Sequence, residues 1–290
     1  MSRFVTFLPM LIPFIPKRIG ISLFAASCLL ATGAVHADIA VFVHGYQSSG
    51  DAWRKAGVFA PLARAGWTDA GGYRYQGRRV IGPNRRPQGK NLLLTVDLPN
   101  NAPVLYQAGY LRAALQSIRR FAPEESLTLV GHSAGGIVSR ATLVLFPELK
   151  VARLVAIATP NLGARLADIG ATLASSPVGL FARLMGERKL ARSGKLLSDI
   201  SPQSNHNFLG WLNSRAHPEA DYIAVIHVED NPAEGDGVIP GRSQDLRAVP
   251  ALAGKATAWW VRGGHGLGRS DGDILAGLLL RPAPAHEPSR

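Results

Sequence analysis

The stretch LTLVGHSAGGIVSR at residues 127–140 places Ser133 at the centre of a G-x-S-x-G pattern. An apolar run precedes the pattern, and apolar residues with helical spacing follow it from 136 to 146. A serine on such a tight strand-to-helix turn projects its hydroxyl above the edge of a sheet. The pattern therefore predicts Ser133 as the nucleophile of an acyl-transfer reaction. The alternative for the same five residues is an ordinary glycine-rich turn.

Two glycines flank this serine where the turn is tightest. Gly131 and Gly135 stand two residues before and two residues after Ser133, at positions where only small residues fit. The helix that follows carries partial positive charge at its N-terminus, and the Ala134 N–H lies there. We expect this N–H to meet the negative charge that develops on a substrate oxygen during the reaction.

Strands and helices alternate along the chain around the serine. The apolar runs that are short enough for buried strands are 38–43, 91–98, 127–130, 151–158, 221–228 and 256–261. The predicted helices are 53–64, 103–121, 136–146 and 271–280. This alternation indicates βαβ units and a parallel sheet, with the functional loops at the carboxyl ends of the strands. A basic, glycine-rich stretch at 71–90 interrupts it, and we expect an exposed excursion there with a hairpin at 73–81.

Two further motifs follow predicted strands. His44-Gly45 comes directly after the first strand, and T-P-N-L-G begins at Thr159, after the fourth. Together with the turn around Ser133, these motifs resemble the α/β-hydrolase fold, specifically its lipase and esterase branch. The resemblance covers residues 38–280 and implies a mostly parallel central sheet flanked by helices. It also implies a helical cap at 161–217, inserted after the half of the domain that carries the nucleophile.

The resemblance implies an oxyanion hole as well. The lipase and esterase branch places an H-G dipeptide after an early strand, and the N–H of the next residue points at the reacting carbonyl. By position, the two donors here are the backbone N–H groups of Tyr46 and Ala134. Taken alone, His44-Gly45 is equally consistent with a plain turn.

A serine needs a base and an acid to become a nucleophile, and in this fold both follow it along the chain, the acid first. His265 stands after the last predicted strand on the glycine-flanked loop R-G-G-H-G-L-G and is the expected base. Asp236, in D-G-V-I-P, resembles the acid motif of lipase-like hydrolases and is the expected acid, with Asp230 and Glu229 as alternatives. The remaining histidines lie before the serine, in the cap, within a strand or near the ends of the chain: His36, His44, His132, His206, His217, His227 and His286.

Residues 164–217 break the alternation and are rich in alanine, leucine, glycine and serine. We expect two or three short helices that cover Ser133 and supply an apolar pocket for an acyl chain. The apolar residues that either line this pocket or pack the cap onto the core are Leu180, Phe181, Leu184, Leu196, Leu197, Phe208, Trp211 and Leu212.

The N-terminal residues 1–37 are predicted to be a secretory signal peptide. Lys17 and Arg18 precede an apolar stretch, and Val35-His36-Ala37 supplies small residues before a cleavage site. An uncleaved membrane anchor is the alternative. A signal peptide implies an exported bacterial protein, either periplasmic or secreted. The Pro-rich residues 281–290 are expected to form a flexible tail.

Charge and motif content limit the partners and cofactors. The chain carries a net charge of +12; of its 32 basic residues three precede Asp38, and none of its 20 acidic residues does, which leaves 29 against 20, or +9. This charge favours contact with an anionic membrane surface, although a soluble basic protein would carry it equally well. No sequence-specific nucleic-acid-binding signature is present. No metal or nucleotide motif occurs, and the one cysteine, Cys28, lies in the predicted signal peptide, so we expect neither a metal nor a cofactor.

The combined prediction is a serine hydrolase that cleaves carboxylic esters, acyl or lipid esters among them, through a Ser-His-Asp triad and an acyl-enzyme. The same triad serves phospholipases and acyltransferases, which stay open as alternatives. A second class is a non-catalytic module that binds lipid or protein on the same scaffold. Replacing Ser133 by alanine separates the classes, because only an enzyme loses turnover while it keeps its fold.

Overall fold

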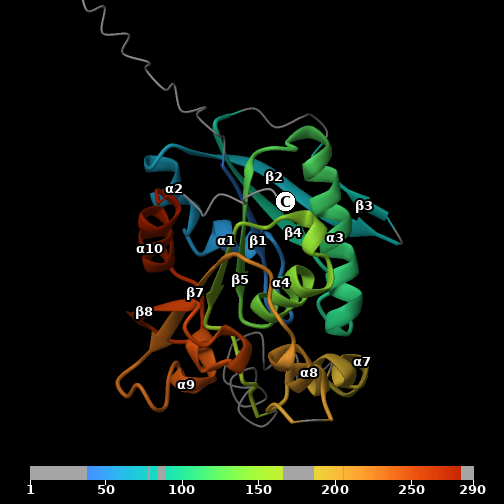
Figure 1. Ribbon diagram of the computed structural model, residues 1–290, viewed down its shortest axis with the longest axis vertical. Coiled ribbons are helices and arrows are strands. Elements are labelled where there is room, and N and C mark those ends of the chain that lie inside the picture. Colours follow the sequence, from blue (N-terminus) through green and yellow to red (C-terminus); the bar gives the residue numbers. More distant parts are fainter. Residues whose placement is uncertain (1–37, 78, 84–88, 166–185, 205, 282–290) are drawn as a thin grey trace, which may run out of the picture. The chain divides into compact units, whose positions relative to one another are not determined.

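The computed structural model describes residues 38–77, 79–83, 89–165, 186–204 and 206–281 (Figure 1). All of them belong to one compact unit, His36–Arg290. The predicted signal peptide, part of the predicted cap and nearly all of the predicted tail lie outside the described residues. No helix in the described part of the chain is long and apolar enough to cross a bilayer.

The centre of the fold is an eight-stranded sheet whose strands are parallel except for β3 at one edge. The strands are β1 (Asp38–Val43), β2 (Trp67–Gln76), β3 (Arg79–Ile81), β4 (Asn91–Asp97), β5 (Ser126–His132), β6 (Arg153–Ile157), β7 (Asp221–Val228) and β8 (Ala256–Arg262). Their order across the sheet is β3-β2-β4-β1-β5-β6-β7-β8. The central strands are continuous apolar runs because helices cover both of their faces. The predicted α/β class and mostly parallel sheet are confirmed.

Helices cover the two faces of the sheet (Figure 1). On one face α3 (Val104–Phe121) packs against α4 (Ala134–Leu145), and on the other α10 (Arg269–Leu279) packs against α2 (Phe59–Arg64), next to α1 (Asp51–Lys55). Burial of each leucine or isoleucine on such a helix stabilises the fold by about 1.5–3 kcal/mol. In α3 the buried apolar residues recur at helical spacing: Val104, Ala108, Leu111, Ala114, Leu115 and Ile118.

Two segments differ from the sequence prediction. The helix expected at 53–64 is two helices, α1 and α2, because Gly57 between them has φ of +76°, which a right-handed helix does not accommodate. The hairpin expected at 73–81 forms, but its first strand begins earlier, at Trp67, and pairs with β4 in the main sheet. The sequence of β2 shows little apolar pattern, because only two of its residues, Trp67 and Tyr73, are buried.

The described part of the predicted cap contains α7 (Gly186–Asp199) and α8 (Phe208–Ser214). Its fully or nearly buried leucines belong to the same core cluster as those of α3 and α4: Leu196, Leu197, Leu209 and Leu212. These leucines pack the segment onto the core, which is one of the two roles expected of them. Leu180, Phe181 and Leu184 lie outside the described residues.

Short helical elements lie in two of the connections between strands, one before β6 and the others between β7 and β8. They are α9 (Gly241–Gln244) and the 3-10 turns Pro147–Leu149, Leu246–Ala248 and Pro250–Leu252. Gln244 of α9 links its turn to β7, because its side chain donates to the carbonyl oxygen of His227 at 3.0 Å and accepts from the His227 N–H at 2.8 Å. The same side chain donates to the Ile239 carbonyl oxygen at 2.9 Å, so Gln244 joins the loop after β7 to the strand itself.

Candidate active site

Ser133 lies in the turn between β5, which ends at His132, and α4, which begins at Ala134. Its backbone has φ 52° and ψ −128°, a conformation that residues other than glycine rarely adopt. The Ser133 N–H donates to the Ile157 carbonyl oxygen of β6 at 2.9 Å, and the Gly136 N–H donates to the Ser133 carbonyl oxygen at 3.0 Å. These two hydrogen bonds hold the turn in its strained conformation.

The glycines on either side of Ser133 occupy positions with no room for a side chain. A Cβ atom at Gly131 would lie 2.5 Å from the Cα atom of Gly136. A Cβ atom at Gly135 would lie 2.4 Å from the carbonyl oxygen of His44. Both distances are shorter than a carbon atom tolerates. Glycine at 131 therefore lets the turn close on Gly136, and glycine at 135 lets it pack against the end of β1.

Three side chains from separate loops form a hydrogen-bonded row at the serine. The Nε2 atom of His265 lies 2.9 Å from the Oγ atom of Ser133, and its Nδ1 atom lies 2.7 Å from the Oδ2 atom of Asp236. The carboxylate can only accept at Nδ1, so the proton sits there and Nε2 is left to accept the serine proton. This arrangement can deprotonate Ser133 while it attacks an electrophilic carbon.

Asp236 is fixed by the turn in which it lies. Its Oδ1 atom accepts from the N–H groups of Val238 and Ile239 at 2.9 Å and 2.7 Å. The side chain is fully buried, whereas the ring of His265 is one-fifth exposed. Since Oδ1 is engaged by the backbone, Oδ2 is directed at the imidazole, which fixes the ring orientation.

The other acidic residues near strand ends face elsewhere. Asp230 forms an exposed ion pair with Arg262 at 2.8 Å. Asp97 accepts from a backbone N–H of the loop after β1. In the described part of the chain, neither of them nor Glu229 hydrogen-bonds to His265. No group of three histidine, cysteine or acidic side chains among the described residues could hold a metal ion.

The loop after β1 brings Tyr46 to the serine. Gly45 and Tyr46 border the same cavity as Ser133, and a Cβ atom at Gly45 would lie 3.0 Å from the Cβ atom of Ser133. Within the described residues, neither the Tyr46 N–H nor the Ala134 N–H donates to another group. Both N–H groups are therefore free for a ligand oxygen.

His44 holds this loop through both of its ring nitrogens. Its buried Nε2 atom accepts from the Leu98 N–H at 3.0 Å, so Nδ1 carries the proton and donates to the Gly45 carbonyl oxygen at 2.9 Å. Burial lowers the pKa of His44, which keeps the ring neutral. This role of the His44 side chain was not predicted from the sequence. The sequence feature that could have indicated this role is the presence of a polar residue, His44, at the end of a buried strand. An apolar residue at this position would leave the Leu98 N–H without a hydrogen-bond partner.

A cavity of about 500 Å³ opens at Ser133 between α1 and the loop that carries His265. Its lining residues are Gly45, Tyr46, Ser48, Ala52, Lys55, Ala56, His132, Ser133, His265, Gly266 and Leu267. The described part of the predicted cap contributes no lining residue. Lys55 brings a positive charge to one wall, and none of the described carboxylates forms an ion pair with it.

A family model described as the alpha/beta hydrolase fold matches residues 40–201, more than half of the 290-residue chain. The chain belongs to the α/β-hydrolase fold family. No curated protein matches the sequence. The membership agrees with the sheet order and with the position of Ser133 between β5 and α4.

Solved structures agree with this α/β-hydrolase fold at low sequence identity. The product of gene lin2722 from Listeria innocua is 14% identical, with a TM-score of 0.61, and the match covers 85% of this chain and 95% of that one. The mature form of the Bacillus licheniformis lipase BlEst2 is 18% identical, with a TM-score of 0.54 and coverage of 85% and 91%. The metagenomic carboxyl esterase MGS0156 is 12% identical, with a TM-score of 0.50 and coverage of 84% and 75%. Identities this low support a shared fold and nothing finer.

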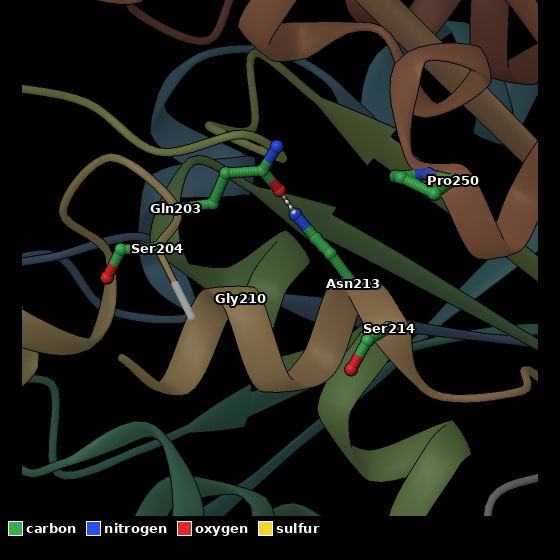
Figure 2. Close-up of a pocket in the computed structure, with 6 residues that line it drawn as sticks. All are labelled: Gln203, Ser204, Gly210, Asn213, Ser214 and Pro250. Carbon is green, nitrogen blue, oxygen red and sulfur yellow. Dashed lines mark hydrogen bonds between the residues drawn. The ribbon is translucent and has the colours of Figure 1, made fainter. Parts of the chain in front are cut away.

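A second cavity of this α/β-hydrolase-fold protein lies beside α8 and shares no lining residue with the cavity at Ser133. Its volume is about 280 Å³, and it is lined by Gln203, Ser204, Gly210, Asn213, Ser214 and Pro250 (Figure 2). Asn213 donates to Gln203 at 2.5 Å and accepts from the buried Arg140 of α4 at 2.6 Å. Burial lowers the pKa of Arg140 to about 9. This polar wall ties α8 to α4, and it contains none of Ser133, His265 and Asp236.

Proposed function

We propose that this protein is a serine hydrolase that cleaves carboxylic esters, with acyl or lipid esters as its substrate class. The observation that carries the proposal is the hydrogen-bonded row from Asp236 through His265 to Ser133. The family membership and the fold shared with a lipase and a carboxyl esterase support it.

The proposed reaction has two steps. Ser133 Oγ attacks the ester carbonyl carbon while His265 Nε2 takes the serine proton, and Asp236 stabilises the resulting imidazolium. The tetrahedral intermediate collapses when His265 returns the proton to the leaving alcohol, which departs and leaves an acyl-enzyme. A water molecule then attacks this acyl group, with His265 again as the base, and releases the carboxylic acid and free Ser133. No cofactor takes part in these steps.

The N–H groups of Tyr46 and Ala134 are proposed to bind the oxygen of the tetrahedral intermediate. Ala134 is the first residue of α4, so the partial positive charge at the helix N-terminus adds to its N–H. Removal of one such donor from an oxyanion hole typically lowers kcat by about 10²- to 10³-fold. His44 supports this role because it fixes the loop that presents Tyr46.

Fluorophosphonate labelling followed by mass spectrometry tests the nucleophile. We expect label on Ser133 of the wild type, none on Ser133→Ala, and unchanged label on Ser214→Ala, which alters an exposed serine of α8. Hydrolysis of p-nitrophenyl esters of increasing chain length then shows whether short or long acyl groups are preferred. A folded wild type that is neither labelled nor active, with and without detergent, would contradict the proposal and favour a binding module.

A phospholipase or acyltransferase would use the same row of residues. The acceptor of the acyl group separates an acyltransferase from the hydrolases, and the ester that is cleaved separates a phospholipase from other esterases. A hydrolase transfers the acyl group to water, whereas an acyltransferase transfers it to an added alcohol. Product analysis with a phospholipid and a primary alcohol present distinguishes the three reactions.

We also propose contact with anionic lipid surfaces. Residues 38–290 carry the net charge of +9 derived above, and Arg74 and Arg79 are exposed on the β2–β3 hairpin. Large exposed apolar residues lie on this hairpin and at the start of α3: Tyr75, Ile81, Leu105 and Tyr106. We expect cosedimentation with anionic vesicles that weakens as salt is raised, and no cosedimentation with zwitterionic ones. Equal recovery with both, or with neither, would contradict this contact.

Export through residues 1–37 is part of the proposal. Its support is the sequence pattern alone, a basic pair followed by an apolar stretch and small residues before Asp38. Expression of the full chain in a bacterium, fractionation and N-terminal sequencing test it. We expect a periplasmic or secreted product that begins at Asp38, and an intact N-terminus in the membrane fraction would indicate an anchor instead.

A further inference from the structure

Two histidines outside the row of Ser133, His265 and Asp236 hold the loop that carries His265. The Nε2 atom of His132 lies 2.8 Å from the carbonyl oxygen of His265. The Nδ1 atom of His227 lies 2.9 Å from the carbonyl oxygen of Gly264, one residue earlier. The loop is thus held through two consecutive peptide groups, by a histidine on β5 and by a histidine on β7.

His227 is itself held on three sides. Its side chain is buried, and its Nε2 atom lies 2.7 Å from the Oδ1 atom of Asp271, at the start of α10. The other carboxylate oxygen of Asp271 accepts from the Gly268 N–H at 2.8 Å. The backbone N–H and carbonyl oxygen of His227 are paired with the side chain of Gln244.

The partners of His227 fix its protonation state. The Gly264 carbonyl and the Asp271 carboxylate can only accept hydrogen bonds, so both ring nitrogens carry a proton and the ring is a cation. Burial lowers the pKa of His227, but the hydrogen bond and charge of Asp271, the Gly264 carbonyl and the charge of Asp236 outweigh it, and the pKa is raised. Three further titratable groups are near His227 or its contact with Gly264: His132, His265 and Glu229. Burial and the charge of His265 lower the pKa of His132 and keep that ring neutral.

We propose that His227, charge-balanced by Asp271, is a positioning residue that sets the place of His265 relative to Ser133. The proposal rests on the hydrolase function above. His265 needs such support because Gly263, Gly264 and Gly266 surround it, and a glycine-rich backbone has little conformational preference of its own. A displacement of about 1 Å at a reacting group can lower the rate by on the order of 10²-fold.

Two substitutions at position 227 separate positioning from simple structural support. Asparagine places its amide nitrogen near the position of Nδ1, so His227→Asn keeps a donor for Gly264 and loses the contact with Asp271. Glutamine places its amide nitrogen near the position of Nε2, so His227→Gln keeps the contact with Asp271 and loses the donor for Gly264. If His227 positions His265, His227→Asn retains more activity than His227→Gln.

The measurements are kcat and KM for a short p-nitrophenyl ester, the rate of fluorophosphonate labelling and the thermal unfolding midpoint. For His227→Gln we expect kcat and the labelling rate to fall about 10- to 100-fold with KM within about twofold. The matched control is Asp221→Asn, which breaks the ion pair with Arg153 at the opposite end of β7. We expect this control to lose stability and to keep kcat within about twofold when assayed below its unfolding midpoint.

The pH profile gives a readout that a structural role would not change. Asp271→Asn removes the charge that raises the pKa of His227, so the ring deprotonates at lower pH and gives up one of its two donors. We expect the alkaline limb of kcat to move to lower pH in Asp271→Asn and to stay in place in Asp221→Asn. If activity follows the unfolding midpoint across all variants, or if His227→Gln labels as fast as the wild type, His227 has no positioning role. A wild type that does not label at all would overturn the hydrolase proposal instead.

Discussion

The Ser133 N–H and the Ile157 carbonyl oxygen are joined by a 2.9 Å hydrogen bond that links the turn at Ser133 to β6. The bond fixes Ser133 at φ 52° and ψ −128°. A residue with a side chain in such a conformation is strained by about 1–3 kcal/mol. The hydrogen bonds and packing between the turn and the neighbouring strands offset this strain. They hold the Ser133 hydroxyl at a position that an unconstrained backbone would not adopt.

Replacing Ser133 by glycine should abolish turnover and relieve the backbone strain. Alanine at the same position loses the hydroxyl and keeps the strain, so we expect Ser133→Gly to be more stable than Ser133→Ala by about 1 kcal/mol. Urea unfolding of the two variants measures the difference. A glycine variant less stable than the alanine variant would show that the turn stores no strain.

Gly135→Ala should destabilise the protein through a collision with the His44 carbonyl oxygen, 2.4 Å from the new Cβ. We expect a loss of about 1–3 kcal/mol and a drop in kcat, because the displaced loop carries the Tyr46 N–H. Gly109→Ala on α3 is the matched control, since its Cβ would meet no atom within 4 Å. Helix propensity makes this control neutral or stabilising by up to about 1 kcal/mol. Equal unfolding midpoints for the two variants would refute the steric argument.

Lys55 should favour substrates with a negative charge close to the ester. We expect Lys55→Met to lower kcat/KM for the mono-p-nitrophenyl ester of glutaric acid about 3- to 10-fold, and to leave p-nitrophenyl butyrate within about twofold. The effect should shrink in 0.5 M salt because a charge at the surface is screened. Lys255→Met, which removes an exposed lysine paired with Glu219, controls for net charge. The same change for both esters would exclude a charge-recognition role.

His217 should make the fold sensitive to acid. Burial lowers its pKa to about 4, so its contribution to stability is complete above its unfolded pKa near 6.5 and is lost as the pH falls towards 4. His217→Asn keeps a donor for the Arg215 carbonyl oxygen, 2.8 Å from Nδ1, and cannot titrate. We expect the wild type to lose about 1.4 kcal/mol more per pH unit than His217→Asn in this range. Urea unfolding between pH 7.5 and 4.5 measures it, and parallel stability curves would contradict the assignment.

The sheet could be predicted from the sequence because its central strands are buried on both faces and are apolar without interruption. The helix α3 could be predicted for a related reason, since its buried residues recur every three or four positions. The strand β2 could not be predicted, because most of its side chains are not buried and show no apolar pattern. It belongs to the sheet through backbone hydrogen bonds to β4. The break between α1 and α2 at Gly57 was not predicted either. A glycine within a helical pattern can adopt a negative or a positive φ, and the sequence does not distinguish the two.

Some residues of the candidate site could be predicted from the sequence and others could not. Ser133 could be picked out because its tight turn constrains the neighbouring residue types. Asp236 and His265 could be picked out because the resemblance to the α/β-hydrolase fold places an acid and then a histidine after the serine, and the structure brings the three side chains together. His44, His132 and His227 could not, because their roles depend on carbonyl and N–H groups contributed by other loops. A histidine inside an apolar strand looks like a core residue until its partners are known.

The row at Ser133 joins the two halves of the polypeptide, and this has a consequence for biosynthesis. α10 packs on α2, and the loop between β8 and α10 carries His265. A growing or truncated chain that ends before α10 lacks Asp271 and the helix that closes the domain against its first helices. Such a chain still contains Ser133, Asp236 and His265, but the carboxylate that pairs with His227 is missing. We therefore expect the proposed hydrolase activity to appear only once α10 has been synthesised.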